Sequence, residues 1–330
     1  MAMLVAGGAG YIGSHAVRML IDEGYDVVVV DNLETGHKDA IHPKATFYEG
    51  DVRDRAFLEQ VFSKEGISCV FHFCAYSLVG ESTEKPLAYF NNNVYGLMSL
   101  LEVMHAHGVD KLIFSSTAAV YGEPAHIPIQ EDDQKAPTNP YGESKWMMEK
   151  IMSWCEATYN IKYVALRYFN VAGAIHDGSI GEDHHPETHL IPIVLQVALH
   201  QREHITIFGD DYDTEDGTCI RDYLHVEDLI EAHINAYHYL EAGHPSDVFN
   251  LGTSHGFSVK EIIEASRRVT GQPIKAELGE RRAGDPSKLV ANSQKAATHL
   301  NFKPKHDHID AIIKSAWNWH KNHPNGYEDA

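Results

Sequence analysis

Cysteine is scarce in this sequence, and long apolar runs are absent from it. The four cysteines, Cys69, Cys74, Cys155 and Cys219, are scattered and form no Cys-x-x-Cys pair. We therefore expect reduced, buried thiols in a cytoplasmic protein and no disulfide framework. No stretch reaches 18 apolar residues, and the N-terminus has neither a basic region nor an apolar run of helix length. These absences argue against a membrane span and against a signal peptide.

An excess of positive charge is also lacking. The 27 Lys and Arg residues are outnumbered by 47 Asp and Glu residues, which gives a formal net charge of −20. Such a chain is a poor partner for nucleic acid or for an anionic membrane. An anionic substrate would have to be bound by local arginines that overcome the unfavourable global field.

Metal-binding sequence patterns are missing as well, although histidine is plentiful. Among the 23 histidines there is no His-Glu-x-x-His motif and no Cys/His pair at ligand spacing. The doublet His184-His185 stands before Pro186 in a polar segment. We expect solvated loop histidines there and no metal site.

Regular alternation of apolar strands and amphipathic helices fills the first half of the chain. At 330 residues, 43% apolar and 22% charged, the chain has the composition of a globular protein of one extended or two domains. Predicted strands cover residues 26–31, 46–51, 69–73, 111–115 and 163–168, and predicted helices cover 12–23, 54–64, 86–107 and 140–159. Apolar strands alternating with helices predict a doubly wound, Rossmann-type α/β fold with a parallel sheet.

After residue 173 the pattern changes to longer polar loops with shorter elements. Helical periodicity covers residues 189–201 and 225–241, short strands are predicted at 205–208 and 248–251, and a capping box at Ser258 opens a helix that Gly271 ends. Trp317 and Trp319 lie two apart in the last helix, so they cannot share a face. We expect a first domain over residues 1–172 and a smaller α/β substrate-binding domain over 173–330, with some chain crossing between them.

The first chemical motif is a string of glycines at the end of the first predicted strand. Gly7, Gly10 and Gly13 are spaced by three between an apolar strand and a helix. In that context one glycine turns the chain, one lets the backbone approach a pyrophosphate, and one lets helix and strand pack closely. Taken alone, the string is also compatible with an ordinary turn.

An acidic residue further along supports the dinucleotide interpretation. Asp31 ends the second predicted strand, 18 residues after Gly13, where a carboxylate binds the 2′-OH of an adenosine ribose. No arginine lies between Asn32 and Lys38 to accept a 2′-phosphate. The cofactor predicted from these features is therefore NAD rather than NADP.

The second motif pairs a tyrosine with a lysine on one helix. Pro140 favours a helix start, so Tyr141 and Lys145 lie four residues apart on one face. An ammonium beside a phenol lowers the pKa of the phenol, and reaching neutrality from ~10 is worth roughly 4 kcal/mol. A pair of this kind also occurs at surfaces by chance. The strand that ends in Phe114-Ser-Ser-Thr117 supports a catalytic role, because Thr117 can relay a hydrogen bond between a substrate hydroxyl and Tyr141; the alternative is that these hydroxyls cap the next turn.

Together these motifs resemble the extended short-chain dehydrogenase/reductase family, and more specifically its UDP-hexose 4-epimerase branch, nearly end to end. Further matching segments are Gly50-Asp51-Val52, Asn91-Asn-Asn-Val94, Arg167-Tyr-Phe-Asn170, His189-Leu-Ile-Pro192, Thr218-Cys-Ile-Arg-Asp-Tyr-Leu-His225 and Arg281-Arg-Ala-Gly-Asp285. Dehydratases of this family carry an acidic pair where this chain has Ala118-Ala119. The resemblance therefore implies a cytoplasmic, homodimeric, NAD-dependent isomerase of galactose metabolism rather than a dehydratase.

The resemblance also implies roles for individual residues. Thr117, Tyr141 and Lys145 are implied as the catalytic group. Implied for the NAD site are Gly7, Gly10, Tyr11, Ile12, Gly13, Asp31, Asn32, Asp51, Val52, Phe73, Ala75, Ser77, Asn92, Lys145 and Phe169. Implied for the UDP-sugar site are Thr117, Tyr141, Asn170, Leu190, Phe208, Arg221, Arg282, Asp285 and Leu289.

Two positions depart from some relatives. Ser77 stands where some of them place a lysine near the cofactor diphosphate, and it weakens that contact if the position is equivalent. Leu289 stands where relatives carry a bulky tyrosine or a smaller residue beside the hexose. It either leaves room for N-acetylated hexoses or simply packs.

The expected reaction is reversible 4-epimerisation of UDP-glucose and UDP-galactose through a transient 4-keto sugar, with NAD bound throughout. Two alternatives stay open at the level of sequence. One is a 4-epimerase of another UDP sugar, such as a uronic acid or a pentose. The other is a nucleotide-sensing protein without turnover, against which the intact Tyr141/Lys145 pair argues.

Overall fold

A seven-stranded parallel sheet is the centre of the computed structural model, which describes residues 1–282 and 285–327. Its strands are Ala2–Ala6 (β1), Val27–Asp31 (β2), Thr46–Glu49 (β3), Ile67–His72 (β4), Lys111–Thr117 (β5), Lys162–Tyr168 (β6) and Asp247–Leu251 (β10). They lie in the order β10-β6-β5-β4-β1-β2-β3. The chain therefore reverses direction across the sheet between β1 and β4, and in sheets of this kind ligands bind beyond the carboxyl ends of the strands at that point.

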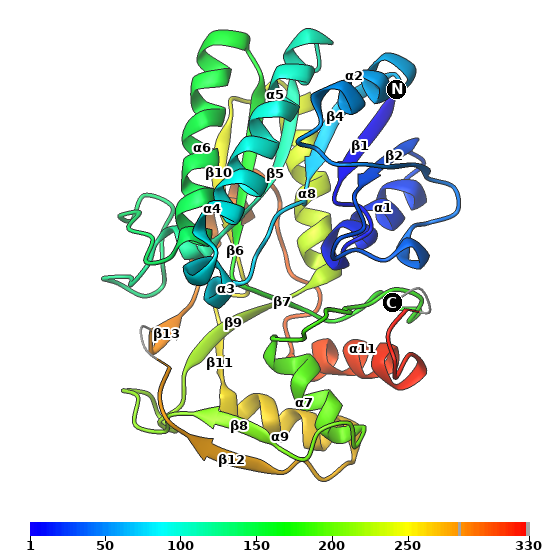
Figure 1. The fold of residues 1–330 in the computed structure, drawn as a ribbon. Helices are drawn as coiled ribbons and strands as arrows, with labels where there is room; N and C mark the ends of the chain where they lie inside the picture. Colours follow the sequence, from blue (N-terminus) through cyan, green and yellow to red (C-terminus); the bar gives the residue numbers. More distant parts are fainter. Residues whose placement is uncertain (283–284, 328–330) are drawn as a thin grey trace.

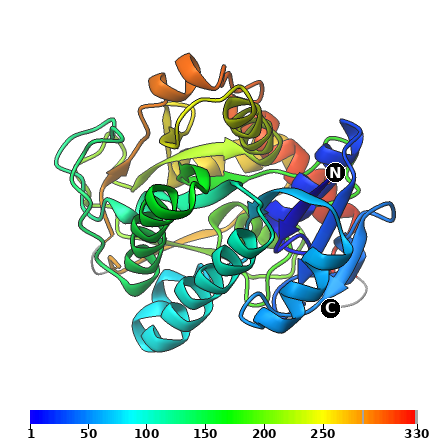
Figure 2. The ribbon, with the colours of Figure 1, turned by 90° about the horizontal axis from the view of Figure 1, so that it is seen from above.

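Helices cover both faces of this sheet (Figures 1 and 2). Alternate strand residues point to opposite faces: Met3 and Val5 of β1 pack with helices Tyr11–Asp22 (α1) and Val226–Glu241 (α8). Leu4 of the same strand packs in the other core. That core also contains residues of helices Arg55–Lys64 (α2), Gly96–Ala106 (α5) and Pro140–Tyr159 (α6). The doubly wound α/β prediction is confirmed.

The predicted helix over residues 86–107 is in fact three consecutive segments. Pro86–Tyr89 (α4) runs into a π-helical stretch, Phe90–Tyr95 (η2), before α5 begins. Buried Asn93 lies in the π-helical stretch, where its side chain hydrogen-bonds the backbone of Tyr76 and the hydroxyl of Ser144. These tertiary hydrogen bonds accompany the local departure from α-helical geometry, which periodicity alone does not predict.

A smaller layer lies below the large sheet in Figure 1. Strand Ile220–His225 (β9) is its centre and pairs with Asn170–Ala172 (β7), Gly256–Ser258 (β11) and Lys288–Leu289 (β13). Ile205–Phe208 (β8) and Ala276–Gly279 (β12) form a separate parallel pair. Helices Leu190–Ala198 (α7), Val259–Thr270 (α9) and Ile309–Asn322 (α11) pack around this layer. The remaining short helices are Lys38–Ala40 (η1), Val79–Glu84 (α3), Ala118–Val120 (η3) and Gln294–His299 (α10).

Several predicted features of the second half are confirmed, and others were missed. The strand at β8 and the capping box at Ser258 are present. β10 pairs with β6 in the large sheet, and α8 packs against that sheet. Trp319 is buried and Trp317 only partly buried, as their spacing requires. Strands β7, β9, β11, β12 and β13 were not predicted, because strands of two to six residues carry little periodic signal.

All four cysteines are free thiols, as predicted, with Cys69 and Cys219 buried and Cys74 and Cys155 partly buried. Within the described ranges, no helix combines the length and the apolar character needed to cross a membrane.

Candidate functional site

The glycine string forms a tight junction between β1 and α1. Gly7 has φ +83°, and a Cβ there would lie 2.5 Å from the backbone nitrogen of Cys74. A Cβ on Gly13 would lie 1.9 Å from the carbonyl oxygen of Gly7, so helix and strand meet too closely for any side chain. Gly10 caps α1 without a side chain, and the first turn of the helix contains no acidic residue. The positive end of the α1 dipole is therefore not neutralised by a side chain and can bind an anion.

Acidic side chains lie at the end of β2 and just beyond the end of β3. The Asp31 carboxylate accepts hydrogen bonds from the backbone nitrogens of Ala9 and Leu33, both at 2.9 Å, and burial raises its pKa. Asn32 donates to Asp51 at 3.2 Å. The guanidinium of Arg53 hydrogen-bonds Asp51 and lowers the pKa of that carboxyl to about 2. This corner of the sheet thus offers carboxylates and an amide beside the glycine turn.

The segment after β4 is tied to the helix that carries Tyr141 and Lys145. Asn93 accepts from Tyr76 N at 2.9 Å and donates to Ser144 Oγ at 2.9 Å. Neighbouring Asn92, which the sequence analysis selected, donates to Asn93 Oδ1 at 3.1 Å. The sequence analysis therefore missed the buried member of the asparagine run, because three adjacent asparagines carry no signal of which one faces inward. The other candidate cofactor residues in or near this region differ in exposure: Val52 is buried, Phe73, Ala75 and Phe169 are partly buried, and Ser77 is exposed.

The face of α6 that carries Tyr141 and Lys145 lies along β5. Lys145 is buried, and its Nζ donates to the carbonyl oxygen of Ser115 at 2.9 Å. One turn further, Glu149 accepts from Ser116 Oγ at 2.5 Å. Positions 141, 145 and 149 share one helix face, and from that face they contact Thr117, Ser115 and Ser116 of β5 respectively. Glu149 was not among the predicted site residues, although extending the Tyr-x-x-x-Lys spacing by one more helical turn leads to it.

Burial dominates the electrostatics of this group. It raises the pKa of Tyr141, while a hydrogen bond with Thr117 acts in the opposite direction. It also lowers the pKa of Lys145 to about 8. The structure differs here from the expectation that Lys145 lowers the pKa of Tyr141: its ammonium is directed to the Ser115 carbonyl and lies 4.9 Å from the Phe114 ring centroid. Thr117 is the direct hydrogen-bond partner of the phenol.

Most of the predicted UDP-sugar residues lie on the smaller layer. Arg221 of β9 forms an ion pair with Asp285 and is paired in register with Leu289 of β13. The guanidinium of Arg282 lies 4.1 Å from the ring centroid of Phe208, at the end of β8. Asn170 begins β7 and Leu190 begins α7. Ala283 and Gly284 of the Arg281–Asp285 motif lie outside the described residues.

His184 departs from the expectation of solvated loop histidines. The His185 side chain is indeed 66% exposed, but that of His184 is only 30% exposed and lies within ion-pair distance of Glu182 and Glu187. Burial lowers the pKa of His184, but its interactions with the two carboxylates outweigh burial and raise it to about 9. The sequence pattern missed this because alternate polar residues of one loop, here Glu182 and His184, can point inward together.

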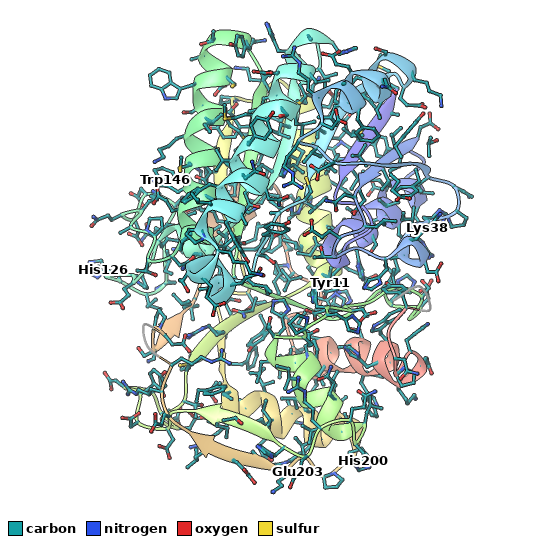
Figure 3. The ribbon with its side chains drawn as sticks, in the orientation of Figure 1. Tyr11, Lys38, His126, Trp146, His200 and Glu203 are labelled. Carbon is teal, nitrogen blue, oxygen red and sulfur yellow. The ribbon has the colours of Figure 1, made fainter. Side chains whose placement is uncertain are left out.

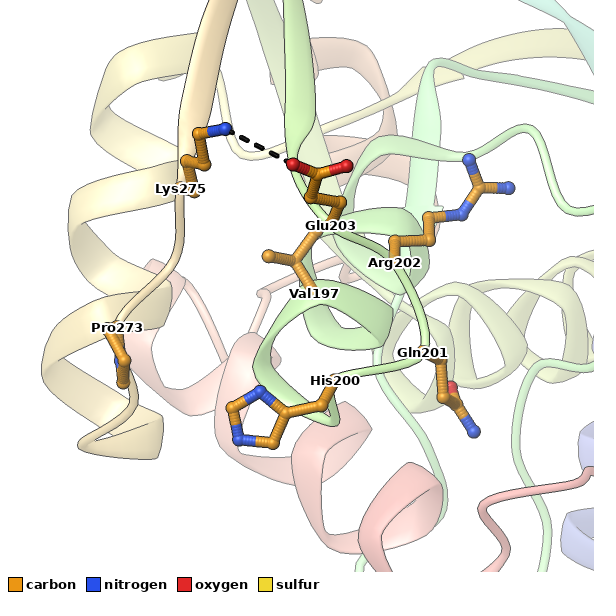
Figure 4. A pocket seen from close by; sticks show the side chains of 7 residues that line it. All are labelled: Val197, His200, Gln201, Arg202, Glu203, Pro273 and Lys275. Atoms are coloured by element: carbon orange, nitrogen blue, oxygen red, sulfur yellow. Dashed lines mark ion pairs between the residues drawn. The ribbon is translucent and has the colours of Figure 1, made fainter.

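A surface hollow of about 510 Å³ lies away from all of these residues, between the α7–β8 and α9–β12 connections (Figure 4). Its lining residues are Val197, His200, Gln201, Arg202, Glu203, Pro273 and Lys275. Figure 3 places His200 and Glu203 at the far end of the smaller layer, and Tyr11 where the two layers meet. None of the predicted site residues lines this hollow, and we assign it no function.

Comparisons with known proteins agree with this architecture. The model of the NAD-dependent epimerase/dehydratase family matches residues 3–252. The UDP-glucose 4-epimerase of Lacticaseibacillus casei is 60% identical over 329 residues, which cover 100% of this chain and 99% of that protein.

Solved structures of similar proteins extend the comparison. A crystal structure of a UDP-glucose 4-epimerase matches with a TM-score of 0.98 and 59% identity, covering 99% of this chain and 100% of the other. The UDP-glucose 4-epimerase from Bifidobacterium longum, solved with NAD+ and UDP, has a TM-score of 0.93 and 40% identity, covering 99% and 100%. A UDP-Glc/GlcNAc 4-epimerase from Campylobacter jejuni has a TM-score of 0.86 and 43% identity, covering 97% and 99%. The chain belongs to the NAD-dependent epimerase/dehydratase family, within its group of UDP-glucose 4-epimerases.

Proposed function

We propose that this chain interconverts UDP-galactose and UDP-glucose by reversible oxidation and reduction at C4 of the hexose. The observation that carries the proposal is the set of hydrogen bonds between one face of α6 and the end of β5. They join Tyr141, Lys145 and Glu149 to residues 115–117. The 60% identity with a UDP-glucose 4-epimerase over the whole chain supports the same reaction.

Tyr141 acts in this proposal as the general base and acid. Its phenolic oxygen takes the proton of the C4 hydroxyl, directly or through Thr117, and returns it when the opposite epimer forms. Lys145 holds the end of β5 through the Ser115 carbonyl and supplies positive charge beside the site. Bound NAD supplies the acceptor and donor of the C4 hydride.

The residues at the strand ends fit a dinucleotide. The glycine turn and the unneutralised N-terminus of α1 suit a pyrophosphate, with Tyr11 and Ile12 in the first helical turn. Asp31 and Asn32 suit the adenosine ribose, and Asp51 and Val52 suit the adenine. Phe73, Ala75, Ser77, Asn92, Lys145 and Phe169 complete the proposed NAD site.

Gly13→Ala is expected to lower bound NAD at least about tenfold, because its Cβ would lie 1.9 Å from the Gly7 carbonyl oxygen and force the turn apart. The measurement is the NAD released on denaturing the purified protein. Gly80→Ala is the matched control, because a Cβ there meets no atom within 4 Å. Retention of NAD by Gly13→Ala at the wild-type level would contradict the assignment of this turn to the cofactor.

The proposed UDP-sugar site draws on the smaller layer. Arg221 and Arg282 provide the planar cations that bind diphosphate oxygens bidentately. They also answer the problem posed by the net charge of −20. Phe208 offers an aromatic surface, and Asn170, Leu190, Asp285 and Leu289 complete the proposed set around the nucleotide and the hexose.

Incubation of the purified protein with UDP-galactose, without added NAD, tests the proposal. We expect UDP-glucose to accumulate until the two epimers reach equilibrium, because the cofactor is reoxidised in place. Exchange of a UDP-pentose or a UDP-uronic acid, but not of UDP-galactose, would favour the related 4-epimerase. Bound NAD with no exchange of any sugar nucleotide would favour a sensing protein.

A further activity on UDP-GlcNAc and UDP-GalNAc is proposed from Leu289, which is partly buried beside Arg221 in the β9–β13 pair. Leu289→Tyr is expected to lower exchange of the N-acetylated pair at least about tenfold, because the larger side chain fills space beside the hexose. Its activity on UDP-galactose should change much less. Leu289→Met, of similar volume, is the control. Absence of exchange by the wild-type protein would contradict this activity.

We make three further proposals, on the domains, the cellular location and the oligomeric state. Residues 1–172 form the NAD-binding domain and 173–330 the UDP-sugar domain, with α8 and β10 crossing back. We also propose a cytoplasmic homodimer. The dimer is supported by exposed apolar side chains on and beside α5 and α6, namely Tyr95, Met98, Trp154 and Tyr159. Light scattering of the purified protein should give the mass of two chains.

A further inference from the structure

We propose that Glu182, His184, Glu187 and His189 bind one divalent transition-metal ion, with zinc the expected ion. The four residues belong to the connection between β7 and α7, in the spacing Glu-x-His-x-x-Glu-x-His. Each offers one ligand atom, and the four atoms lie within 4.8 Å of one another. Two imidazoles and two carboxylates are a donor set that suits zinc.

The distances between the donor atoms fit a tetrahedral site. Zinc lies about 2.0–2.2 Å from nitrogen and oxygen ligands, so tetrahedral ligands stand about 3.3–3.5 Å apart. His184 Nδ1 lies 3.3 Å from Glu182 Oε1 and 3.6 Å from Glu187 Oε2. His189 Nδ1 lies 3.5 Å from Glu187 Oε1. The 2.6 Å separation of His189 Nδ1 and Glu182 Oε1 is shorter, and the two histidines lie near different oxygens of Glu187, so a bound ion requires small movements of these side chains.

Burial of the carboxylates provides an independent observation. The side chains of Glu182 and Glu187 are 3% and 5% exposed. Glu182 Oε1 and His184 Nδ1 are buried, and neither makes a well-oriented hydrogen bond among the described residues, although Glu182 Oε1 lies 2.6 Å from His189 Nδ1 and 3.3 Å from His184 Nδ1. Buried polar atoms without hydrogen bonds are rare in folded proteins and often mark an ion or a water.

Contacts with neighbouring elements help to position the cluster. The backbone carbonyl of Glu182 accepts from Trp319 Nε1 at 3.2 Å, which ties it to α11. Glu187 Oε1 accepts from the backbone nitrogen of His189 at 2.8 Å. The ring of His184 lies edge-on to that of Tyr11, 6.2 Å between centroids, in the first turn of α1. The cluster therefore stands between the proposed cofactor turn and the start of α7, where Leu190 is proposed to contact substrate.

The negative charge of the two carboxylates can be balanced either by protons on the histidines or by a metal ion. Two carboxylates are neutralised equally by two protonated histidines or by one divalent cation on two neutral histidines. With four protein ligands the site has no open position, so the ion would be structural and would fix the β7–α7 connection against α1 and α11.

Two other His/carboxylate groups of the described chain are weaker candidates. In the group of His37, Asp183 and His185, the ring of His185 is largely exposed. In the group of His225, Glu227 and His306, the two rings stack 4.2 Å apart, and His225 hydrogen-bonds Ser315. His185 therefore provides the matched control within the same loop.

The experiment uses full-length protein without a histidine tag, stripped with a chelator, loaded with zinc and desalted. We expect one zinc per chain by elemental analysis and, after loading with cobalt instead, the intense visible bands of tetrahedral Co²⁺. Removing even an outer partner of a metal site costs about 10–100-fold in affinity, so Glu182→Gln and His189→Gln are each expected to lose more. His185→Gln should keep the full zinc content.

Zinc content of the loaded wild-type protein at the level of the buffer blank would overturn the proposal, as would equal zinc in wild type and in both ligand variants. The cobalt spectrum of the wild-type protein decides the question if the variants fail to fold. An octahedral or featureless spectrum would also overturn the tetrahedral site.

Discussion

Tyr141→Phe is expected to lower kcat for the conversion of UDP-galactose to UDP-glucose by about 10²–10⁴-fold, the range for loss of a positioned general base. The substitution removes only the phenolic hydroxyl, which is the group hydrogen-bonded to Thr117. The ring keeps its place at the start of α6, so cofactor and nucleotide binding should persist. A 100-fold loss corresponds to about 2.7 kcal/mol of transition-state stabilisation. The measurement is the steady-state rate at saturating UDP-galactose, with bound NAD determined on the same preparation.

Tyr159→Phe is the matched control for this prediction. Tyr159 ends the same helix, is exposed, and stacks on His105 with ring centroids 4.2 Å apart. Its hydroxyl has no part in the proposed chemistry, so kcat should stay within about twofold of wild type. Retention of most turnover by Tyr141→Phe would remove Tyr141 from the mechanism while leaving the fold and the NAD site untouched.

Local patterns were enough to predict the large sheet and helix α6 with its Tyr141 and Lys145 pair. Apolar strands such as β1 and β2 are buried on both faces, which makes their sequences nearly continuous apolar runs. The glycine string could be interpreted from the sequence because a side chain at Gly7 or Gly13 would clash with the neighbouring backbone. The Tyr141 and Lys145 pair could be predicted because helix geometry alone places residues four positions apart on one face.

The smaller layer and the electrostatics of the site were harder to predict. β9 is the centre of that layer, yet it contains Arg221 and Asp222, so its pattern does not look apolar. The direction of the Lys145 ammonium depends on the Ser115 carbonyl, a backbone acceptor 30 residues away in the chain. The Glu182–His189 cluster depends on how a loop without regular periodicity folds against α1 and α11. Each of these features is set by tertiary contacts, which no local spacing encodes.

A buried ion pair behind α6 helps to fix this helix on β5. Arg167 of β6 and Glu149 of α6 are 2% and 3% exposed, and their side chains are joined by two hydrogen bonds, at 3.0 and 2.5 Å. Arg167 also donates to Tyr121 at 2.8 Å, and Tyr121 donates to Asn250 at 2.6 Å. The network thus links β6, α6 and β10, and its charges are fully paired.

Glu149→Ala is therefore expected to lower the free energy of unfolding by about 3–5 kcal/mol, because it leaves the buried guanidinium of Arg167 without a counter-charge. The measurement is urea unfolding followed by tryptophan fluorescence. The double variant Glu149→Leu/Arg167→Met should be less destabilised than the single one, since no uncompensated charge remains. Glu156→Ala on the same helix removes a solvent-accessible ion pair with Lys162 and should cost no more than about 1 kcal/mol. If Glu149→Ala lowered the free energy of unfolding no more than Glu156→Ala, the Arg167 guanidinium would have to be bound by water or by another acceptor. The Arg167–Glu149 ion pair would then not be what fixes the position of α6.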